Sequence, residues 1–240
     1  MNHMNPKVVT REEWLKQRID LLEAEKDFTR KRDALSKRRR ELPWVKVDKD
    51  YAFDGPNGRQ SLEELFDGRS QLIVYHFMFA PDWEKPCKSC SFWADHFDGA
   101  IPHLNARDVS FVAISRAPRS KLKVFAERMG WKFKWLSSQD SSFNYDFNVS
   151  FEPKAMADGT TVYNYAKTKV PFSELQGVSV FARGPDGEVY HTYSCFGRGQ
   201  DLVNGAYNLL DLTPKGRDED ALPFTMSWVR YHDEYETVNA

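Results

Sequence analysis

The sequence predicts an α/β fold in which a mixed central sheet is flanked by helices. Two observations lead to this prediction: apolar, strand-like runs alternate with helical stretches from Trp44 onward, and a glycine-containing turn joins two strand patterns near the C-terminal end. The 240 residues can form one large domain or a domain with an appendage. A content of 41% hydrophobic and 29% charged residues excludes collagen-like, low-complexity and largely disordered chains.

Charge and hydropathy exclude two classes of partner. Lysine and arginine total 34 against 35 aspartate and glutamate residues, which leaves no overall basic field for nucleic acid. The longest apolar run, Leu72 to Pro81, is much shorter than the roughly 20 residues of a membrane-spanning helix. Residues Met1 to Lys7 lack the basic and apolar regions of a secretory signal. We therefore expect a cytoplasmic protein that binds neither nucleic acid nor membranes.

Residues 1–43 are expected to form an N-terminal helical arm. More than half of the segment from Thr10 to Glu41 is charged, and it contains neither glycine nor proline. Thr10 and Glu13 make a capping box, and apolar residues recur every seven positions at Trp14, Leu21, Phe28 and Leu35. This narrow stripe predicts a helix that packs on its own domain or on a second subunit, which would make a homodimer. The basic run Lys37–Arg40 suits a solvated helix end.

The main domain is predicted over residues 44–216. Its first elements are short strands around Val45, Val47 and Phe53 and a small helix that Ser61 and Glu64 cap. There follow a central strand at Leu72–Phe79, a helix from Cys87 toward Leu104 that Pro102 kinks or splits, a strand at Val109–Ser115, a helix at Pro118–Met129 and an extended stretch at Trp131–Leu136. This alternation of strands and helices is typical of a layered α/β sheet.

The last third of the chain departs from that alternation. Residues 138–176 show no clear period, and we expect an insertion with little regular structure. Val178–Arg183 and Glu188–Phe196 then form an antiparallel hairpin, and Gly199–Leu212 the last helix. Residues 217–240 form an aromatic tail that we expect to pack on the domain, because it carries Phe224, Trp228, Tyr231 and Tyr235.

The motif Cys87-Lys88-Ser89-Cys90 is the strongest indication of chemistry. It follows a buried strand by one loop and begins a helix, where unpaired N–H groups and the helix dipole stabilise a thiolate. Cys87 is therefore the expected nucleophile, and Lys88 adds a nearby cation. Cys90, one turn further, can attack a mixed disulfide on Cys87 and release the reduced substrate.

Other interpretations of the two thiols remain open. They can be half of a zinc site that Cys195 and a histidine complete, although no second Cys-x-x-Cys or histidine pair is present. They can also be inert thiols in a packed helix. We expect neither a metal nor a cofactor: no dinucleotide-binding glycine pattern or phosphate-binding loop occurs, so electrons would come from another thiol.

The order of these elements resembles the thioredoxin-like fold from Trp44 to Leu212, with the insertion excepted. Several phrases more narrowly resemble a bacterial family of predicted dithiol-disulfide oxidoreductases, formerly a domain of unknown function. They are His76-Phe-Met-Phe79, Trp83, Cys87-x-x-Cys90, His191-Thr-Tyr193 with Gly197-Arg198-Gly199, Asp211-Leu-Thr-Pro214, Gly216-Arg217 and the stretch from Trp228 to Tyr235. The resemblance implies a thioredoxin-like fold and a thiol-disulfide oxidoreductase activity on an unknown substrate, protein or small molecule.

The chain departs from thioredoxins at positions that matter for substrates. The cis-proline that precedes the hairpin strand in thioredoxins is replaced by Gly177-Val178, and Pro171 lies several residues away. Pro86 stands where a tryptophan precedes the first cysteine, with Trp83 nearby in the loop. His76 falls near the place of the buried acid that helps to deprotonate the second cysteine. It is either a proton acceptor for Cys90 or a core histidine with one hydrogen bond.

Three residues bear on the alternative functions. Peroxiredoxins place a threonine or serine three residues before the peroxidatic cysteine, whereas this chain has Glu84, so a peroxiredoxin-like thiol peroxidase is the weaker alternative. Arg198 either binds an anionic substrate or is a loop arginine. Cys195 is either a third redox thiol or a small buried residue. A thioredoxin-fold binding or assembly protein with non-catalytic cysteines is the alternative from another class.

Overall fold

The computed structural model describes residues 6–236. By its internal contacts the chain divides into one unit that ends at Pro43 and a second that begins at Trp44, and each is described here by itself. Residues 1–5 and residues 237–240 lie outside the described residues. The first group holds most of the segment in which no secretory signal is expected, and the second belongs to the predicted tail.

The first unit contains the predicted helix, α1 (Arg11–Arg40). The capping box is present: the Glu13 N–H donates to Thr10 Oγ1 at 3.2 Å, and the Thr10 N–H donates to Glu13 Oε2 at 3.0 Å. Lys37, Arg38, Arg39 and Arg40 occupy the last turn, next to the negative end of the helix dipole. No residue of α1 is buried, so no part of its apolar stripe is covered.

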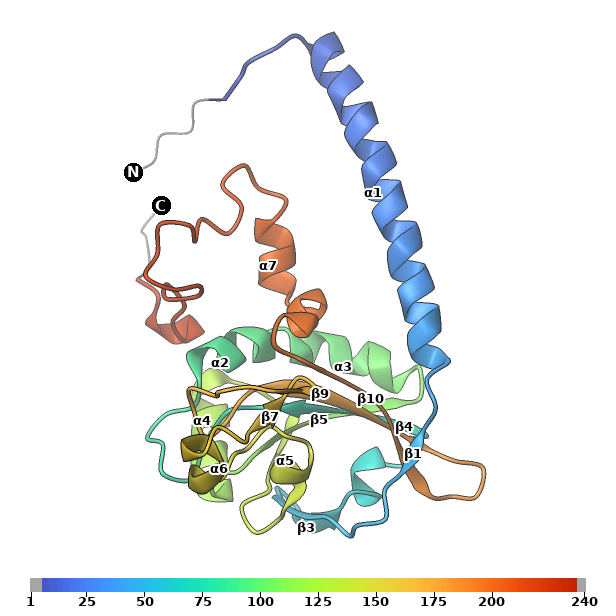
Figure 1. Ribbon diagram of the computed structural model, residues 1–240, viewed down its shortest axis with the longest axis vertical. Coiled ribbons are helices and arrows are strands. Elements are labelled where there is room, and N and C mark those ends of the chain that lie inside the picture. The colour runs from blue at the N-terminus through green and yellow to red at the C-terminus, as the bar shows by residue number, and fades with distance from the viewer. Residues whose placement is uncertain (1–5, 237–240) are drawn as a thin grey trace. The chain divides into compact units, whose positions relative to one another are not determined.

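The second unit is built on an eight-stranded mixed sheet (Figure 1). Its strands are β1 (Val45–Lys46), β2 (Ala52–Gly55), β3 (Gly58–Ser61), β4 (Gln71–His76), β5 (Val109–Ser115), β6 (Lys134–Ser137), β9 (Gly177–Arg183) and β10 (Val189–Phe196), in the order β1-β10-β9-β4-β5-β6-β2-β3. β4, β5 and β6 are parallel, and β9 joins β4 antiparallel and continues into β10. A parallel pair extended by an antiparallel hairpin at β4 is the thioredoxin-like arrangement, and this prediction is confirmed.

Outside the insertion, the helical segments of the second unit are η1 (Glu64–Phe66), α2 (Lys88–Ala94), α3 (Phe97–Asn105), α4 (Arg119–Met129), η2 (Gly197–Val203), α7 (Gly205–Leu210) and η3 (His232–Glu234). The helix predicted at Pro118–Met129 is confirmed as α4, whereas the helix predicted from Cys87 toward Leu104 is divided into α2 and α3. The break between α2 and α3 lies at Asp95 and His96, whereas Pro102 lies inside α3, so the predicted position of the break was wrong. Tertiary contacts determine it: Asp95 accepts from the Trp131 Nε1–H, and His96 Nε2 accepts the Ala206 N–H.

Two further expectations need correction. The insertion has more regular structure than its sequence suggests, with α5 (Phe143–Asp146), α6 (Pro153–Ala157) and a small sheet of β7 (Val162–Tyr163) and β8 (Ala166–Lys167). The predicted last helix is a 3-10 segment, η2, followed by α7. Asn204 separates them because its extended backbone ends η2, while its Oδ1 accepts the Tyr207 N–H at 3.0 Å and caps α7.

The sheet separates two hydrophobic clusters. On one face Tyr75 and Ala113 pack with residues of α2, α3, α4 and α7, including Cys90. On the other face Val74 and Val112 pack with η1 and with Phe143 of α5. In Figure 1, α2 and α3 run along one side of the sheet and α5 lies on the other side. None of the described helices is both long enough and apolar enough to span a membrane.

The segment after α7 lies against the cluster that contains Cys90. Val229 and Tyr231 are buried, and Trp228 is partly buried. The Tyr231 hydroxyl donates to the Pro86 carbonyl at 2.6 Å, which ties this segment to the residue before Cys87. Phe224, in contrast, is 69% exposed, so the aromatic residues of this segment do not all pack.

Candidate active site

Cys87 occupies the N-cap of α2. Its backbone is extended, its N–H donates to the Met78 carbonyl at 3.0 Å, and its carbonyl accepts the Ser91 N–H at 3.1 Å. These two hydrogen bonds hold Cys87 between the end of the central strand and the first turn of the helix. The thiol is partly buried, and no disulfide joins it to Cys90.

The surroundings of Cys87 favour its thiolate. The Cys90 side chain, with the N–H groups of Cys90 and Ser89 in the first turn of α2, lowers the pKa of Cys87 to about 7 although burial opposes this. Such N–H groups are the unpaired donors of a helix N-terminus. Cys87 therefore carries more thiolate at neutral pH than an ordinary cysteine does.

The surroundings of Cys90 disfavour its thiolate. It is fully buried, and burial together with the Cys87 thiolate raises its pKa well above that of an ordinary thiol. Its Sγ–H donates to Gln176 Oε1 at 3.5 Å, and the Tyr75 hydroxyl donates to its carbonyl at 3.5 Å. Cys90 is therefore a protonated thiol, and it lies next to the cysteine that ionises more readily.

Lys88 follows Cys87 in the first turn of α2, and Trp83 lies in the loop before it. The Lys88 ammonium is exposed and lies 5.8 Å from the Tyr231 ring centroid. Trp83 packs on the same cluster as Cys87, and its carbonyl accepts from Lys121 Nζ at 2.8 Å. Trp83 thus helps to shape the loop before the thiols.

His76 points away from the thiols. Consecutive strand residues face opposite sides of a sheet, so Tyr75 lies on the face of Cys90 and His76 on the other. His76 Nε2 is 2.8 Å from Ser179 Oγ, and the ring stacks on Phe143. Burial, with a smaller effect of His191, lowers the pKa of His76 to about 3. The structure corrects the interpretation of His76 as a proton acceptor for Cys90 and favours the core histidine.

Gln176 is a site residue that the sequence did not reveal. It immediately precedes β9, the position that the cis-proline holds in thioredoxins, so Gly177-Val178 is displaced from it by one residue. No cis peptide bond occurs within residues 6–236. The Gln176 carbonyl accepts the Tyr163 hydroxyl at 2.7 Å, and the Gly197 N–H donates to the same hydroxyl at 2.9 Å. No periodic pattern marked Gln176 or Tyr163, because both lie in the insertion.

Arg198 and Cys195 lie further along the chain. Arg198, at the start of η2, has an exposed side chain whose Nε and NH2 contact Asp201 Oδ2 at 3.3 and 3.0 Å. It lines a cleft that also includes Gln176. Cys195 is a partly buried residue of β10 paired with Val178.

The described residues contain no obvious metal centre. Between residues 6 and 236, no three histidine, cysteine, aspartate or glutamate side chains gather closely enough to hold a metal ion. Cys87 and Cys90 are thus a pair without further metal-binding side chains around them. Glu84, which stands where peroxiredoxins have a threonine or serine, is exposed in the loop before α2.

Comparisons with known proteins give a family and several structural similarities. The chain is similar to a peroxidoxin, BcpB, from Mycobacterium tuberculosis, with 17% identity and a TM-score of 0.47 over 68% of this chain and 93% of that chain. It is also similar to a PrxQ mutant from Xylella fastidiosa, with 12% identity and a TM-score of 0.44 over 69% of this chain and 95% of that chain. A comparison with curated proteins gives no match. A family model described as "Bacterial protein of unknown function (DUF899)" matches residues 3–235, and the chain belongs to this family.

Proposed function

We propose that the protein is a thiol-disulfide oxidoreductase in which Cys87 attacks and Cys90 resolves. The observation that supports this most directly is the position of the two thiols: Cys87 lies at the N-cap of α2, and Cys90 is buried one turn further along the helix. The pKa of Cys87 is lowered to about 7, whereas that of Cys90 is raised. Two inert thiols in a packed helix would both have raised pKa values, because burial disfavours thiolates.

The reaction follows from this asymmetry. The Cys87 thiolate attacks one sulfur of a substrate disulfide, forms a mixed disulfide and releases the first thiolate. Cys90 then gives its proton to that leaving thiolate and attacks the Cys87 sulfur. The second substrate thiolate leaves and takes a proton from solvent. Two electrons have passed from the cysteine pair to the substrate, and a second thiol compound restores the reduced pair.

The test combines a redox titration with a trapping variant. The protein is equilibrated with defined ratios of reduced and oxidised dithiothreitol, and the state of each thiol is mapped by mass spectrometry. We expect a reversible Cys87–Cys90 disulfide with a potential of roughly −120 to −270 mV. Cys90→Ser should accumulate a mixed disulfide on Cys87, and Cys195→Ser, the matched control, should behave as the unmodified protein.

The other outcomes separate the alternatives. A Cys87 that hydrogen peroxide oxidises faster than any disulfide does would indicate a peroxiredoxin-like thiol peroxidase. Thiols that never pair, or that release zinc on alkylation, would contradict the proposal and indicate a binding or assembly protein.

The proposal carries expectations about location and partners. We place the chemistry in the cytoplasm, with a thiol or disulfide compound as partner rather than nucleic acid or a membrane. A homodimer through α1 is supported by its apolar stripe, in which Leu21 is 55% and Phe28 67% exposed. Sedimentation analysis should give a dimer that the double variant Leu21→Glu/Phe28→Glu converts to a monomer. A monomeric unmodified protein would contradict this expectation.

A further inference from the structure

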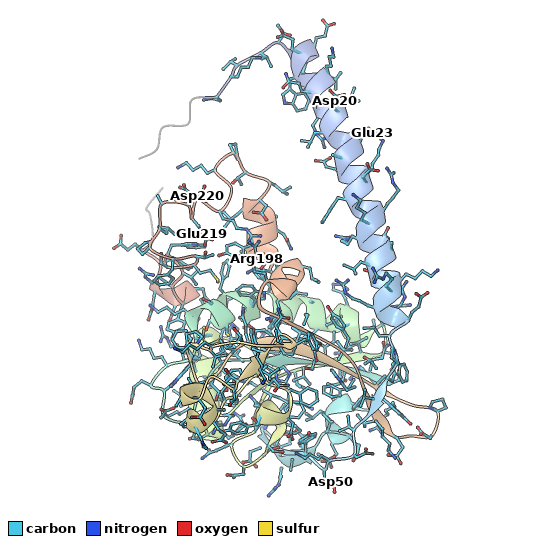
Figure 2. All side chains as sticks on the ribbon, in the orientation of Figure 1. Asp20, Glu23, Asp50, Arg198, Glu219 and Asp220 are labelled. Atoms are coloured by element: carbon cyan, nitrogen blue, oxygen red, sulfur yellow. The ribbon has the colours of Figure 1, made fainter. Side chains whose placement is uncertain are left out.

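Glu174 is a buried acidic residue to which the reaction described above assigns no role. Its side chain is 1% exposed, and no other acidic residue between positions 6 and 236 is buried. Figure 2 labels four of the exposed ones, Asp20 and Glu23 on α1, Asp50 before β2 and Asp220 after α7. Taking a carboxylate out of water is unfavourable unless cations and hydrogen-bond donors replace the water. The partners of Glu174 therefore decide what its burial achieves.

Two side chains from distant segments bind the Glu174 carboxylate. Arg116, which directly follows β5, donates from Nη1 to Oε1 at 3.0 Å. The Ser150 hydroxyl donates to Oε2 at 2.6 Å. Arg116 is itself held in place, because its guanidinium carbon lies 4.5 Å from the centroid of the Tyr145 ring. The carboxylate thus connects the end of β5 to the insertion.

The backbone around Glu174 is fixed as well. Residues 149–151 and 173–175 run antiparallel, with an isolated bridge between Ser150 and Glu174. Backbone hydrogen bonds of 2.9 and 2.8 Å join the two stretches on either side of this bridge. The ion pair and the backbone bonds together hold the last residues of the insertion before β9 begins.

These last residues of the insertion contact the thiols. Gln176 Oε1 accepts the hydrogen bond from Cys90 Sγ at 3.5 Å. Leu175 packs on the hydrophobic cluster that contains Cys90 and against which Cys87 lies. Gln176 is therefore the connection between the Glu174 ion pair and the proposed resolving thiol.

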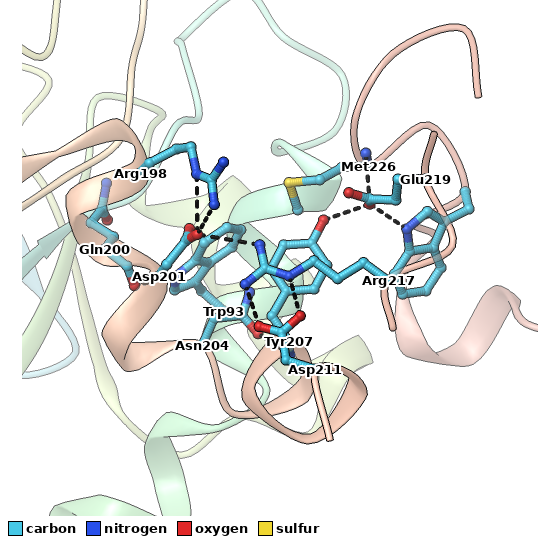
Figure 3. Close-up of polar contacts among 11 residues, drawn as sticks. Trp93, Arg198, Gln200, Asp201, Asn204, Tyr207, Asp211, Arg217, Glu219 and Met226 are labelled. Carbon is cyan, nitrogen blue, oxygen red and sulfur yellow. Dashed lines mark hydrogen bonds and ion pairs between the residues drawn. The ribbon is translucent and has the colours of Figure 1, made fainter. Parts of the chain in front are cut away.

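Glu219 shows that the protein can join segments through a carboxylate without burying it. Its Oε1 accepts three hydrogen bonds at 2.6 to 3.0 Å, from the Tyr207 hydroxyl, the Trp228 Nε1–H and the Met226 N–H (Figure 3). Glu219 nevertheless stays partly exposed. Joining segments therefore does not by itself account for the burial of Glu174.

Stability does not account for the burial either. Burial raises the pKa of Glu174 to about 7, although the Ser150 hydroxyl and the Arg116 guanidinium lower it, and Asp82 in the loop before α2 adds to the rise. A carboxyl whose pKa rises on folding makes the folded state less stable as the pH increases between 4.5 and about 7. Tyr145, the other titratable group beside the pair, has a pKa raised by burial and stays neutral there. Buried ion pairs are in general weak contributors to stability.

We propose that Glu174 is a positioning residue for the step in which Cys90 resolves the mixed disulfide. Its ion pair with Arg116 fixes the position of Gln176, whose side chain orients the Cys90 thiol. The inference rests on the proposed function of Cys87 and Cys90. Protonation of Glu174 removes the charge that Arg116 pairs with, so the end of the insertion is held less firmly. Resolution is therefore faster when Glu174 is ionised.

A two-step thiol assay separates attack from resolution. The reduced protein, in a Cys195→Ser background, is mixed with a limiting amount of dithiobis(nitrobenzoate), and the release of nitrothiobenzoate is followed by its absorbance. The first equivalent reports the attack of Cys87, with a rate that rises with protein concentration. The second reports the attack of Cys90 on the mixed disulfide, with a rate that does not. Mass spectrometry of acid-quenched samples identifies the mixed disulfide between the two phases.

Glu174→Gln retains hydrogen-bonding groups at the same place and removes the charge. We expect it to slow the second phase about tenfold at pH 8 and above, and to change the first phase less than about twofold. The two proteins should converge below about pH 6, where Glu174 of the unmodified protein is protonated. The ratio of their second-phase rates should therefore rise with a midpoint near pH 7. Cys87 cannot produce this midpoint, because its sulfur is then part of the mixed disulfide.

Three further variants assign the effect. Glu152→Gln, the matched control, removes an exposed carboxylate at the N-cap of α6 and should change neither phase. Glu219→Gln alters a carboxylate that joins segments and should give no pH-dependent ratio. Gln176→Leu removes the acceptor for Cys90 and should slow the second phase by itself. Adding Glu174→Gln to it should slow that phase little further, because the two residues act in sequence.

The outcomes separate this inference from the proposed function. If the unmodified protein releases only one equivalent, Cys90 does not resolve, and the proposed function itself fails. If Glu174→Gln matches Glu152→Gln in both phases, the inference is overturned while the oxidoreductase stands. A second phase slowed equally at every pH would also overturn it, because Glu174 would then support only the fold. A second phase of the unmodified protein without a break near pH 7 overturns it without any variant.

Discussion

Each face of the central sheet contains a cluster of polar side chains, and the two clusters differ in the pH range in which they titrate. On one face, Cys87 and Cys90 lie in the first turn of α2, and the pKa of Cys87 is lowered to about 7. On the other, His76 contacts Ser179, Ser179 contacts Ser194 at 2.8 Å, and Ser194 contacts His191 Nε2 at 2.7 Å. That network is buried, and burial lowers the pKa of His76 to about 3. The thiol face can exchange protons near neutral pH, whereas His76 remains neutral.

The direction in which a strand residue points decides whether it can contact the cysteines. Tyr75 and His76 are neighbours on β4, yet only Tyr75 contacts the cysteines, through a hydrogen bond to the Cys90 carbonyl. A histidine one position earlier would lie on the thiol face. The following variants test whether the two faces are as separate as this geometry indicates.

The largest expected effect is on the thiol face. Cys87→Ser should reduce disulfide-exchange activity more than 100-fold, because a serine hydroxyl is not ionised at neutral pH. Turnover of bis(2-hydroxyethyl) disulfide with dithiothreitol, corrected for the uncatalysed reaction, measures this loss. Activity retained within threefold would move the nucleophile to another residue.

On the histidine face, His76→Ala should lower stability without changing the chemistry. The ring is 1% exposed and stacks on Phe143 and Phe147, so its loss leaves a cavity and should cost about 2–4 kcal/mol of the free energy of unfolding. Urea unfolding measures that loss, and the thiolate absorbance of the folded variant measures the pKa of Cys87. A shift in the pKa of Cys87 with unchanged stability would mean that the faces are coupled.

Cys90→Ala should raise the pKa of Cys87. The Cys90 side chain is the largest cause of the lowered pKa of Cys87, so its removal should raise that pKa from about 7 toward the ordinary value of about 8.5. Alkylation at pH 6 should become about tenfold slower, because less thiolate is present. The pH profile of the alkylation rate gives both midpoints, and equal midpoints would assign the tuning to the helix N-terminus alone.

Tyr75→Phe should produce the smallest effect. The hydroxyl donates one long hydrogen bond to the Cys90 carbonyl, so its loss should slow the resolving step a few-fold and change stability by about 1 kcal/mol. Rapid quenching during exchange should then show more mixed disulfide on Cys87 than in the unmodified protein. A variant indistinguishable from the unmodified protein would remove Tyr75 from the site.

Local patterns were sufficient for the fold and for the two cysteines. The density of apolar residues predicted β4 and β5, the turn at residues 184–187 predicted the hairpin, and Thr10 with Glu13 predicted the start of α1. Cys87 and Cys90 could be singled out as candidates because their place at a helix N-terminus is a local feature, and their roles as nucleophile and resolving thiol stay a prediction. Each of these predictions depends on residues close together in sequence.

The rest of the site depends on contacts between distant segments. Gln176 contacts Cys90 from 86 positions away, and Tyr163 contacts Gln176 from an insertion without a periodic pattern. Glu174 is bound by Arg116 and Ser150, which lie after β5 and in the insertion. His76 was related to the thiols through its likeness to the place of the buried acid of thioredoxins, but the alternation of side chains along β4 turns it to the other face of the sheet.

The hydrogen bond from the Tyr231 hydroxyl to the Pro86 carbonyl joins residues 145 positions apart, and this has a consequence for synthesis. A growing polypeptide carries both cysteines long before Tyr231 has been added. Contacts of such large separation form late in folding, because a long loop must close first. The loop before Cys87 can therefore form its hydrogen bond with Tyr231 only after almost all of the domain has left the ribosome. Full thiol reactivity should develop as one of the last steps of folding.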